Sequence, residues 1–575
     1  MTALIWEHLP CPDEQVPALA DALGVTPVFA RLLCQRGLAD PDAARRFLSP
    51  SLDHLHDPLR LPDMAAAVDR ILAAVTSRDR IAIHGDYDVD GITSTVILRR
   101  ALELLGADVV HFLPERMRDG YGLHPPAIER LHAEGVRLIV SVDCGTRSVE
   151  AAERARALGV DLIITDHHEP EPTLPRALAV INPKRRDSSY PDPDLAGVGV
   201  ALKLVQALCR RTGHEHWLPA FVKIAALGTL ADVVPVRGEN RVIAKLGLEM
   251  LSRGPHKVGL RALLEASGLT GKTIDTYQVA FVIAPRVNAA GRMSTPDIAA
   301  RLLLASDESM ADEVRGLAEQ LNEENQRRQQ EEQRILAHAR KVIETDPGVG
   351  SRSVLVVAGD GWHRGVIGIV ASRLAETFYR PVVVLSVDGE VAYGSCRSIP
   401  SFDMLGALER CGALLTRFGG HRQAAGLTME AARIQEFRAA LADWGDSVLS
   451  PDDLRPRLRI DLPLRFGTIR GDLVAELERL APFGLGNPRP VFSAAGVELA
   501  DRPRRIKDRH LKMALRQDGR LFRAIAWQGI AHEAWLTDHR GTVDVAFSLN
   551  QNVFNGETYL ELTLADLKPT VASSQ

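Results

Sequence analysis

The sequence predicts an α/β fold built around a largely parallel sheet. Three short runs of apolar, mostly β-branched residues begin at Ile81, Leu138 and Leu162, and each is followed by a helical pattern. Such runs suit strands that are buried on both faces, and strands that alternate with helices usually pair in parallel. Each run ends in acidic residues or histidines. Because the carboxyl ends of parallel strands line the ligand crevice of an open sheet, we expect these side chains to converge.

Length and composition describe a large globular chain. With 575 residues, of which 46% are hydrophobic and 25% charged, we expect several domains. The net charge of −5 argues against a wholly basic protein that coats nucleic acid, but it allows a local basic groove. The 6 cysteines include no Cys-x-x-Cys pair, and we find neither a signal-peptide pattern nor a long apolar run. We therefore expect a cytoplasmic protein with reduced thiols and no membrane span.

The pattern along the chain divides it into five expected parts. Residues 1–50 form a helical lead-in, and residues 51–305 hold the parallel sheet. Residues 306–347 are rich in Glu, Gln and Arg and predict one long polar helix, either a solvated spacer or a functional strut between two domains. Residues 348–454 predict a second α/β domain. Residues 455–575 predict a small all-β barrel from short alternating runs at 458–462, 520–527, 543–549 and 559–564.

The residues at the three strand ends are those of a metal centre. His84 is followed by aspartates at alternate positions, Asp86, Asp88 and Asp90, whose carboxylates could share one face. Carboxylates crowded in this way at neutral pH need a cation or protonation. A hard divalent cation takes such a mixture of oxygen and nitrogen ligands. Two cations about 3.5–4 Å apart would suit hydrolysis of a phosphate ester.

Each of these residues taken alone has a simpler interpretation. His84 could be a surface or capping group, and Asp143, after the second run, could cap the helix that follows it. The pair His167 and His168, after the third run, could be one packed and one exposed histidine. A shared metal centre explains all three strand ends at once.

At these residues the chain resembles the DHH phosphoesterase family, named for motifs of the Asp166-His167-His168 type. The four metal motifs of the family have counterparts at 84–91, 141–143, 166–168 and 228–232. The glycine-rich stretch 419–426 resembles the signature of the family's partner domain, DHHA1, and 286–292 is typical of its single-strand-specific exonuclease branch. The resemblance spans about residues 50 to 565 and includes a C-terminal barrel similar to an OB-fold.

The resemblance implies a role for each residue of the metal centre. His84 and Asp88 would hold one cation, and Asp90, His167 and Asp232 the other, with Asp143 bridging the two. Asp86 would be either a ligand or an orienting group, and Asp166 would orient its neighbours. His168 would contact the scissile phosphate or protonate the leaving oxygen, which makes Asp143 and His168 the catalytic residues. The cations would be Mn²⁺ or Mg²⁺.

The resemblance also suggests where nucleic acid binds. Ser395 and Arg397 resemble the family's pocket for a 5′ phosphate, with Arg116 as a second arm, because a guanidinium and a hydroxyl suit a terminal phosphate. Further expected contacts are Arg286, Asn288, His363 and His421. A simpler interpretation of Arg397 is a surface salt bridge, and of the two histidine segments a glycine-dependent turn.

The predicted barrel carries a basic stretch at residues 502–512, with Arg505 and Lys507 as its candidate contacts. It is either a nucleic-acid surface or a solvated charged face. Phe522 and Trp527 could stack on bases, although core packing suits at least one of them.

Together these features predict a metal-dependent nuclease that degrades single-stranded DNA, and the resemblance implies that it is a 5′→3′ exonuclease that acts in recombination and repair. We expect a monomer that needs a free 5′ end, with single-strand-binding protein and a RecQ-type helicase as partners implied by the resemblance. One alternative is a phosphoesterase for pyrophosphate, short oligoribonucleotides or cyclic dinucleotides, which the barrel and its basic stretch disfavour. The other is a non-catalytic DNA-binding scaffold, which the full set of ligand positions disfavours.

Overall fold

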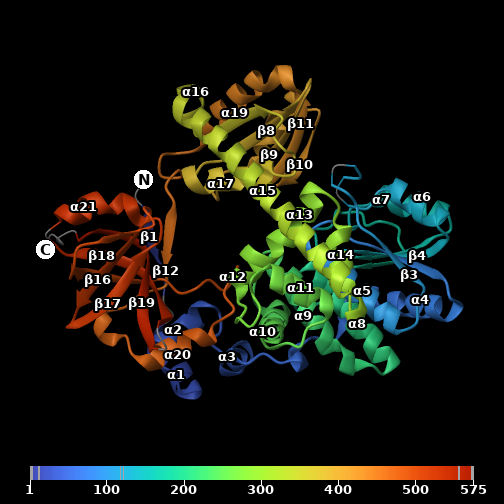
Figure 1. Cartoon of the computed structure of the whole chain (residues 1–575), viewed down its shortest axis with the longest axis horizontal. Coiled ribbons are helices and arrows are strands. Elements are labelled where there is room, and N and C mark those ends of the chain that lie inside the picture. The colour runs from blue at the N-terminus through green and yellow to red at the C-terminus, as the bar shows by residue number, and fades with distance from the viewer. Residues whose placement is uncertain are drawn as a thin grey trace. The chain divides into compact units, whose positions relative to one another are not determined.

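The computed structural model describes residues 4–10, 13–116, 118–120, 122–539, 541–554 and 557–570. They fall into two compact units (Figure 1). One unit is continuous, from residue 51 to 454. The other joins the two ends of the chain, residues 1–50 and 455–575.

A parallel five-stranded sheet forms the core of the first part of the continuous unit, which confirms the predicted fold class. Its order is β3 (Val109–Phe112), β2 (Arg80–His84), β4 (Val136–Val142), β5 (Asp161–Thr165) and β6 (Ala179–Ile181). Alternate residues face opposite sides: Ile83 packs in one core cluster and Ala82 in another. The sheet is therefore buried on both faces, which explains the unbroken apolar runs.

Helices cover both faces of this sheet and lead to its carboxyl edge. α4 (Met64–Ser77), α5 (Val89–Leu104) and α8 (Gly197–Thr212) share a core cluster with one face, and α6 (Pro125–Ala133) and α7 (Val149–Ala157) with the other. α9 (Leu218–Ala231) and α10 (Gly238–Arg253) follow α8.

The predicted long helix is α15 (Ala311–Thr345), 35 residues that belong to two cores. Val314, Leu317 and Leu321 pack with the helices of the first domain. Ile335 and Ile343 pack against the second sheet. Between them Arg328 is held by Glu332 and Asn325 at 2.5 and 2.6 Å. The helix is thus a half-buried strut and not a solvated spacer.

The second domain contains a mixed sheet in the order β10 (Arg417–His421), β11 (Ala424–Glu430), β9 (Val391–Arg397), β8 (Val382–Asp388) and β7 (Leu355–Asp360). Only β7 and β8 are parallel in it. α15 and α17 (Ile367–Phe378) cover one face, while α18 (Met404–Arg410) and α19 (Ile434–Val448) cover the other.

The second unit is a closed barrel with the N-terminal helices packed on it. The ring runs β14 (Phe492–Leu499), β18 (Val543–Phe554), β19 (Glu557–Pro569), β17 (Arg520–Ala526) and β16 (His510–Gln517), and β16 returns to β14. α1 (Val16–Leu23), α2 (Pro27–Gln35) and α3 (Pro41–Leu48) share its core cluster. Figure 1 shows the blue N-terminal helices beside the orange α20 (Gly471–Arg479).

One expected barrel strand lies outside the ring. β12 (Arg457–Ile460) pairs in parallel with β1 (Ile5–His8), with Ile5 opposite Arg457, to form a separate two-stranded sheet. Only β13 (Leu462–Pro463) continues from it to lie beside β14. The prediction of a barrel strand over 458–462 was wrong because alternation shows that a strand exists but not which strand it pairs with.

Within the described residues, no single helix is both long and apolar enough to cross a bilayer. One sharply bent pair, Asp13–Leu23 with Pro27–Gln35, meets the criteria of length and composition.

Candidate metal centre and nucleic-acid contacts

The carboxylates that follow β2 come from a loop residue, Asp86, and from Asp88 at the start of α5. Asp88 caps α5: its Oδ1 accepts hydrogen bonds from the N–H groups of Asp90 (2.9 Å) and Gly91 (3.1 Å). Asp86 is 2% exposed and its Oδ1 has no hydrogen-bond partner. Gly91 is required here because a Cβ would lie 2.5 Å from the backbone nitrogen of Asp86. Ligand oxygens of Asp86, Asp88 and Asp143 lie within 4.8 Å of one another.

The prediction that Asp86, Asp88 and Asp90 share one face was wrong. α5 begins at Val89, so the period of two expected for an extended loop changes to 3.6 before Asp90. The Asp90 carboxylate instead accepts hydrogen bonds from Gly197 and Val198, both at 2.7 Å, at the N-terminus of α8. A helix N-terminus stabilises a carboxylate through its exposed N–H groups and its dipole.

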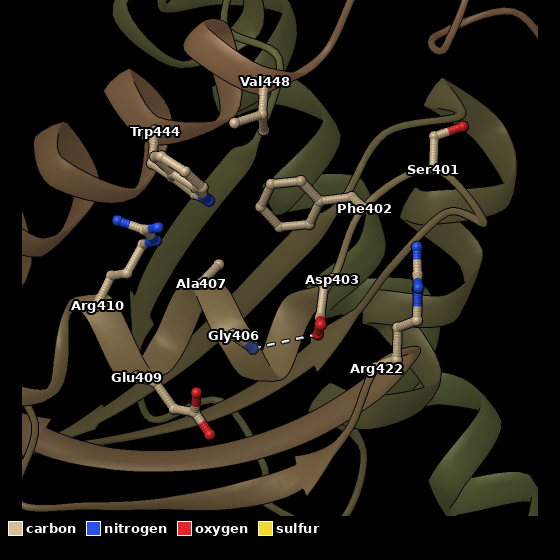
Figure 2. A pocket seen from close by; sticks show the side chains of 10 residues that line it. All are labelled: Ser401, Phe402, Asp403, Gly406, Ala407, Glu409, Arg410, Arg422, Trp444 and Val448. Atoms are coloured by element: carbon tan, nitrogen blue, oxygen red, sulfur yellow. Dashed lines mark hydrogen bonds between the residues drawn. The ribbon is translucent and has the colours of Figure 1, made fainter.

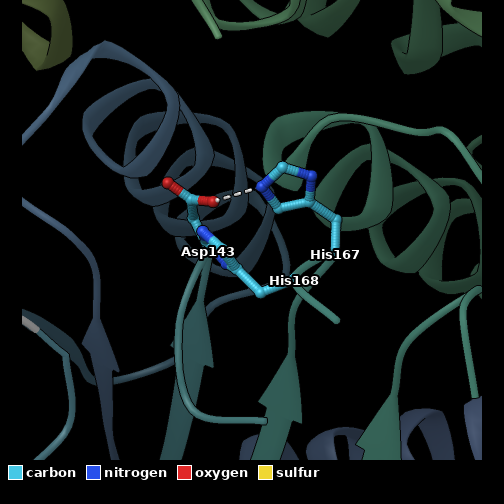
Figure 3. Close-up of side chains that lie close together, drawn as sticks. All are labelled: Asp143, His167 and His168. Atoms are coloured by element: carbon cyan, nitrogen blue, oxygen red, sulfur yellow. Dashed lines mark ion pairs between the residues drawn. The ribbon is translucent and has the colours of Figure 1, made fainter. Parts of the chain in front are cut away.

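Asp143 follows β4 in a conformation that suits close packing. Its φ is 60°, in the left-handed region, and the side chain is 2% exposed. Gly197 lies against it, since a Cβ there would come within 2.3 Å of Asp143 Oδ1. That oxygen has no hydrogen-bond partner and lies 3.2 Å from His167 Nε2. Figure 3 shows this ion pair as a dashed line. Burial, with the charges of Asp90 and Asp88, raises the pKa of Asp143 well above its usual value.

In the segment after β5, the pKa values of the two histidines are shifted in opposite directions. Asp166 Oδ1 accepts hydrogen bonds from both histidine N–H groups and from His168 Nδ1, at 2.7–3.1 Å. Burial alone would raise the pKa of Asp166, but its bond to His168 and the histidine charges lower it well below its usual value. Asp166 in turn outweighs the effect of burial on His168 and raises its pKa. His167 differs: burial, and then the charge of His168, lower its pKa to about 3.

A second group of ligand atoms gathers around His167. Atoms of Asp90, His167 and Asp232 lie within 4.8 Å of one another. Asp232 ends α9, and its Oδ2 has no hydrogen-bond partner and lies 3.7 Å from His167 Nε2. Burial, together with the neighbouring carboxylates, raises the pKa of Asp90 to about 7 and that of Asp232 to about 9. Asp143 belongs to both sides of the centre, since it also groups with His167 and His168.

His84 lies at the end of β2, fully buried, with its ring 5.3 Å from that of Phe112. Burial lowers the pKa of His84 to about 4, and its Nε2 has no hydrogen-bond partner. A neutral imidazole with an unused nitrogen is the form that binds metals. In the described residues, however, His84 is in none of the groups of three that lie within 4.8 Å, whereas Asp86 is.

The donor set fits divalent cations. Five of the buried atoms without a hydrogen-bond partner are ligand-type atoms of predicted ligands: His84 Nε2, Asp86 Oδ1, Asp143 Oδ1, His167 Nε2 and Asp232 Oδ2. Buried polar atoms are otherwise almost always hydrogen-bonded. Carboxylates whose pKa is raised by burial and by each other return to their charged form when a cation compensates them. The assignment of each ligand to one cation stays a prediction.

Sequence reasoning missed the groups that support this centre. The N–H groups of Gly197 and Val198 carry no side-chain signature. Asn182 Nδ2 donates to Thr146 Oγ1 (3.0 Å) and to the His168 carbonyl (2.8 Å). Gly197 was the one available signal, because the absence of a side chain there allows α8 to approach Asp143 closely.

The residues predicted to bind a 5′ phosphate are two arginines and a serine. Arg397 Nη1 donates to Ser395 Oγ at 3.4 Å, and burial, with the charge of Arg116, lowers the pKa of Arg397. Arg116 lies 4.3 Å over the Tyr87 ring, and its Nε is buried without a hydrogen-bond partner. Two neighbouring guanidinium groups and a hydroxyl suit an anion. Because Arg116 contacts Tyr87, a residue of the β2–α5 loop, this set lies next to that loop.

Three of the four other predicted contacts form hydrogen bonds within the fold. Asn288 Oδ1 accepts from Val89 N–H at 3.1 Å, which joins α13 (Ala284–Met293) to the metal loop. Arg286 donates to the carbonyl of Val282 (2.7 Å). His363 Nδ1 accepts from Gly365 N–H at 3.1 Å, as a turn residue would. His421 ends β10 and is exposed.

A separate hollow of about 610 Å³ lies beside α18 and α19 (Figure 2). Arg410 stacks 3.8 Å over the Trp444 ring, and Asp403 accepts from Gly406 N–H at 3.1 Å. None of the predicted contact residues lines it.

On the barrel, the basic stretch lies at β15 (Arg504–Ile506) and β16 and is exposed. Glu533 binds Arg505 through both oxygens at 2.7 Å, so part of the positive charge of the basic stretch is neutralised. Lys507 is exposed in a turn with φ of 47°. Phe522 is a core residue, 6% exposed, whereas Trp527 is 58% exposed. Trp527 is thus the aromatic side chain available to a base.

Comparisons with known proteins identify the family of this chain. Three family descriptions match the chain: DHH family, N-terminal domain (residues 80–229), DHHA1 domain (351–445) and RecJ OB domain (460–566). A "single-stranded-DNA-specific exonuclease RecJ" from Bacillus subtilis is 37% identical over 95% of this chain and 69% of its own length. The RecJ of Escherichia coli is 33% identical over 94% of this chain and 96% of its own length.

Solved structures give the same result. RecJ from Thermus thermophilus in complex with Mn²⁺ matches with a TM-score of 0.84 and 34% identity, over 99% of this chain and 80% of that one. The same protein was also solved with Mg²⁺ and matches with a TM-score of 0.76 and 32% identity, over 99% of this chain and 79% of that one. The predicted cations are those with which this relative was crystallised. The chain therefore belongs to the RecJ family of DHH proteins.

Proposed function

We propose that this protein is a nuclease that uses two divalent cations to remove nucleotides from the 5′ end of single-stranded DNA. The observation that carries the proposal is the pair of ligand groups that share Asp143, with unpartnered buried atoms on both sides. RecJ relatives over nearly the whole chain support the choice of substrate.

The residues divide the chemical work. Mn²⁺ or Mg²⁺ held there would supply Lewis-acid activation of water and charge compensation for the phosphoryl group. Asp86, Asp88, Asp90, Asp143, His167 and Asp232 supply ligand atoms, with His84 at the end of β2. Asp166 fixes His168 through Nδ1 and raises the pKa of His168, which favours the protonated ring. We assign to His168 Nε2 the proton for the leaving oxygen.

The cationic set near the metal loop is compatible with the proposed polarity, which rests on the family likeness. Arg116 and Arg397 with Ser395 would bind a terminal 5′ phosphate through charge-assisted hydrogen bonds. The barrel would hold the strand farther along through its basic stretch and Trp527. The family likeness adds the finer parts of the proposal: a monomer of the cytoplasm that acts in recombination and repair, with single-strand-binding protein and a RecQ-type helicase as partners.

A direct test uses internally labelled DNA that carries a 5′ phosphate, in single-stranded and duplex form. With Mn²⁺ we expect mononucleotides to be lost from the 5′ end of the single strand alone, and EDTA to stop the reaction. A 3′-labelled substrate that loses its label first would overturn the polarity. Turnover of short oligoribonucleotides or pyrophosphate without cleavage of DNA would keep the metal centre and reject the substrate.

A further inference from the structure

We propose that the continuous unit carries a second binding site, a pocket for a small carboxylate with an apolar body. It lies away from the metal centre and goes beyond the proposed nuclease function. A cavity of about 700 Å³ is lined by α5, α9, α11 (Val258–Ala266) and α14 (Asp297–Leu304). Ligand pockets typically have this volume, a mostly apolar lining and a few polar groups that fix the ligand.

The walls of the cavity are apolar. They include Val96, Leu104, Trp217, Phe221, Leu260 and Leu303. Leu104 is 56% exposed, although it sits on a helix that is otherwise well covered. Covering this surface would be favourable at about 25 cal/mol for each Å² of apolar area removed from water. The body of the ligand is therefore aliphatic or aromatic.

The polar groups of the cavity include a lysine and a histidine that lie side by side. Lys223 Nζ donates to the carbonyl of Pro255 at 2.6 Å and lies 3.5 Å from His256 Nδ1. In the described part of the chain, no carboxylate lies within 4.0 Å of either side chain. Burial lowers the pKa of Lys223, and burial together with Lys223 lowers that of His256. An anion placed against this pair would restore the charge that burial opposes.

The other charged residues of the lining are mostly positive. Arg100 and Lys257 also border the cavity. Glu308, the one acidic residue in the lining, already accepts two hydrogen bonds from Arg261, at 3.0 and 2.6 Å. A cavity with an apolar wall and a lysine that has no carboxylate partner among the described residues matches a carboxylate attached to an apolar body.

This site is separate from the metal centre but shares two helices with it. Asp88 caps the start of α5, and Val96 lies about 12 Å farther along the helix axis. Lys223 lies about 14 Å along α9 from Asp232, which ends that helix. None of the predicted metal ligands lines the cavity.

The test uses the full-length protein and 8-anilinonaphthalene-1-sulfonate, an apolar anion that fluoresces in apolar surroundings. We expect one saturable site per chain, with the dye displaced by decanoate but not by decanol at equal concentration. Lys223→Gln should weaken dye binding by about tenfold or more, because it removes a charge-assisted bond. Ala220→Phe should weaken it by filling the cavity that Ala220 lines. Lys341→Gln, on α15, is the matched control and should leave the affinity unchanged.

Three results would overturn the proposal. They are the absence of a saturable site, unchanged affinity in both Lys223→Gln and Ala220→Phe, and displacement by decanol as well as by decanoate. Displacement by single-stranded DNA would move the dye to the nucleic-acid surface and also count against it. If Lys223→Gln lowers the melting temperature, Lys257→Gln at the same cavity replaces it, with the same expected weakening.

Discussion

The carboxyl edge of the first sheet, which carries the predicted metal ligands (the metal edge), and the basic stretch of the barrel differ in the burial and pairing of their charged groups. At the metal edge, carboxylates are buried, their pKa values are raised, and several atoms lack any hydrogen-bond partner. On the barrel, the cations are exposed, and Glu533 and Glu561 already accompany two of them. Buried charges interact strongly because the surrounding dielectric is low, whereas exposed charges are screened by water and salt. We therefore expect single substitutions to act strongly at the first region and weakly at the second.

The largest effect should come from Asp143→Asn, which keeps the shape of a side chain that groups with both sides of the centre. We expect cleavage to fall by about a thousandfold or more, or about 4 kcal/mol in activation free energy. Affinity for single-stranded DNA should stay equal or rise, since a negative charge is removed. Single-turnover cleavage and fluorescence anisotropy measure the two quantities.

The control for this variant is Asp312→Asn, whose side chain is 96% exposed on α15. It should leave both quantities unchanged. Retained cleavage in Asp143→Asn would remove Asp143 from the shared role and break the comparison at its strongest point.

The next effect concerns proton transfer. His168→Gln should lower kcat by about a hundredfold to ten-thousandfold, the usual contribution of a positioned acid or base, with a smaller change in KM. Affinity for Mn²⁺, measured by titration, should change little if His168 acts on the phosphate. A loss of metal affinity as large as the loss of kcat would show instead that His168 is a ligand.

A third variant tests a buried group that supports the metal edge from behind. Asn240 is fully buried, accepts from Ala196 N–H (3.3 Å) and donates to the carbonyls of Asp194 (2.6 Å) and Pro235 (3.2 Å). It thus ties the start of α8 to the segment after Asp232. Asn240→Ala should reduce the free energy of unfolding by about 1–3 kcal/mol, because buried groups lose their partners.

The same variant should also weaken Mn²⁺ binding, which denaturant unfolding and a metal titration would separate. Asn550→Ala in the barrel, which removes one hydrogen bond to Thr563 Oγ1, is the control and should leave metal binding unchanged. If both variants left metal affinity unchanged, Asn240 would be a purely structural residue.

The smallest effect is expected on the barrel. Lys507→Gln should lower the slope of log Kobs against log salt by about 0.7, the value for one phosphate contact with a single strand. Arg505→Gln should change the slope less, because Glu533 holds its guanidinium. Equal slopes for wild type and Lys507→Gln would show that this turn does not meet the strand.

Deletion experiments must respect the units that the structure defines. Removal of residues 455–575 alone would strip α1, α2 and α3 of the core cluster that they share with the barrel. A loss of activity in that truncation would then mix lost DNA binding with exposed apolar surface. Removing residues 1–50 together with 455–575 gives the matched deletion.

The sequence by itself determined the local features of this protein. Apolar runs gave strands that are buried on both faces, and the order of Asp and His after each run gave the metal edge, because parallel strands bring their carboxyl ends to one side. The polar stretch with few breakers gave α15. These predictions hold because backbone period and burial are written in neighbouring residues.

Only the tertiary structure decided which of these residues meet. Asp90 turns to the N-terminus of α8, Asp86 joins Asp88 and Asp143, β12 leaves the barrel for β1, and Arg505 finds Glu533. The partners of Asp90, β12 and Arg505 lie far away in the sequence, and the grouping of Asp86 depends on where α5 begins and on Asp143 from another strand. A side-chain pattern specifies that a residue needs a partner, but the packing of whole elements selects that partner.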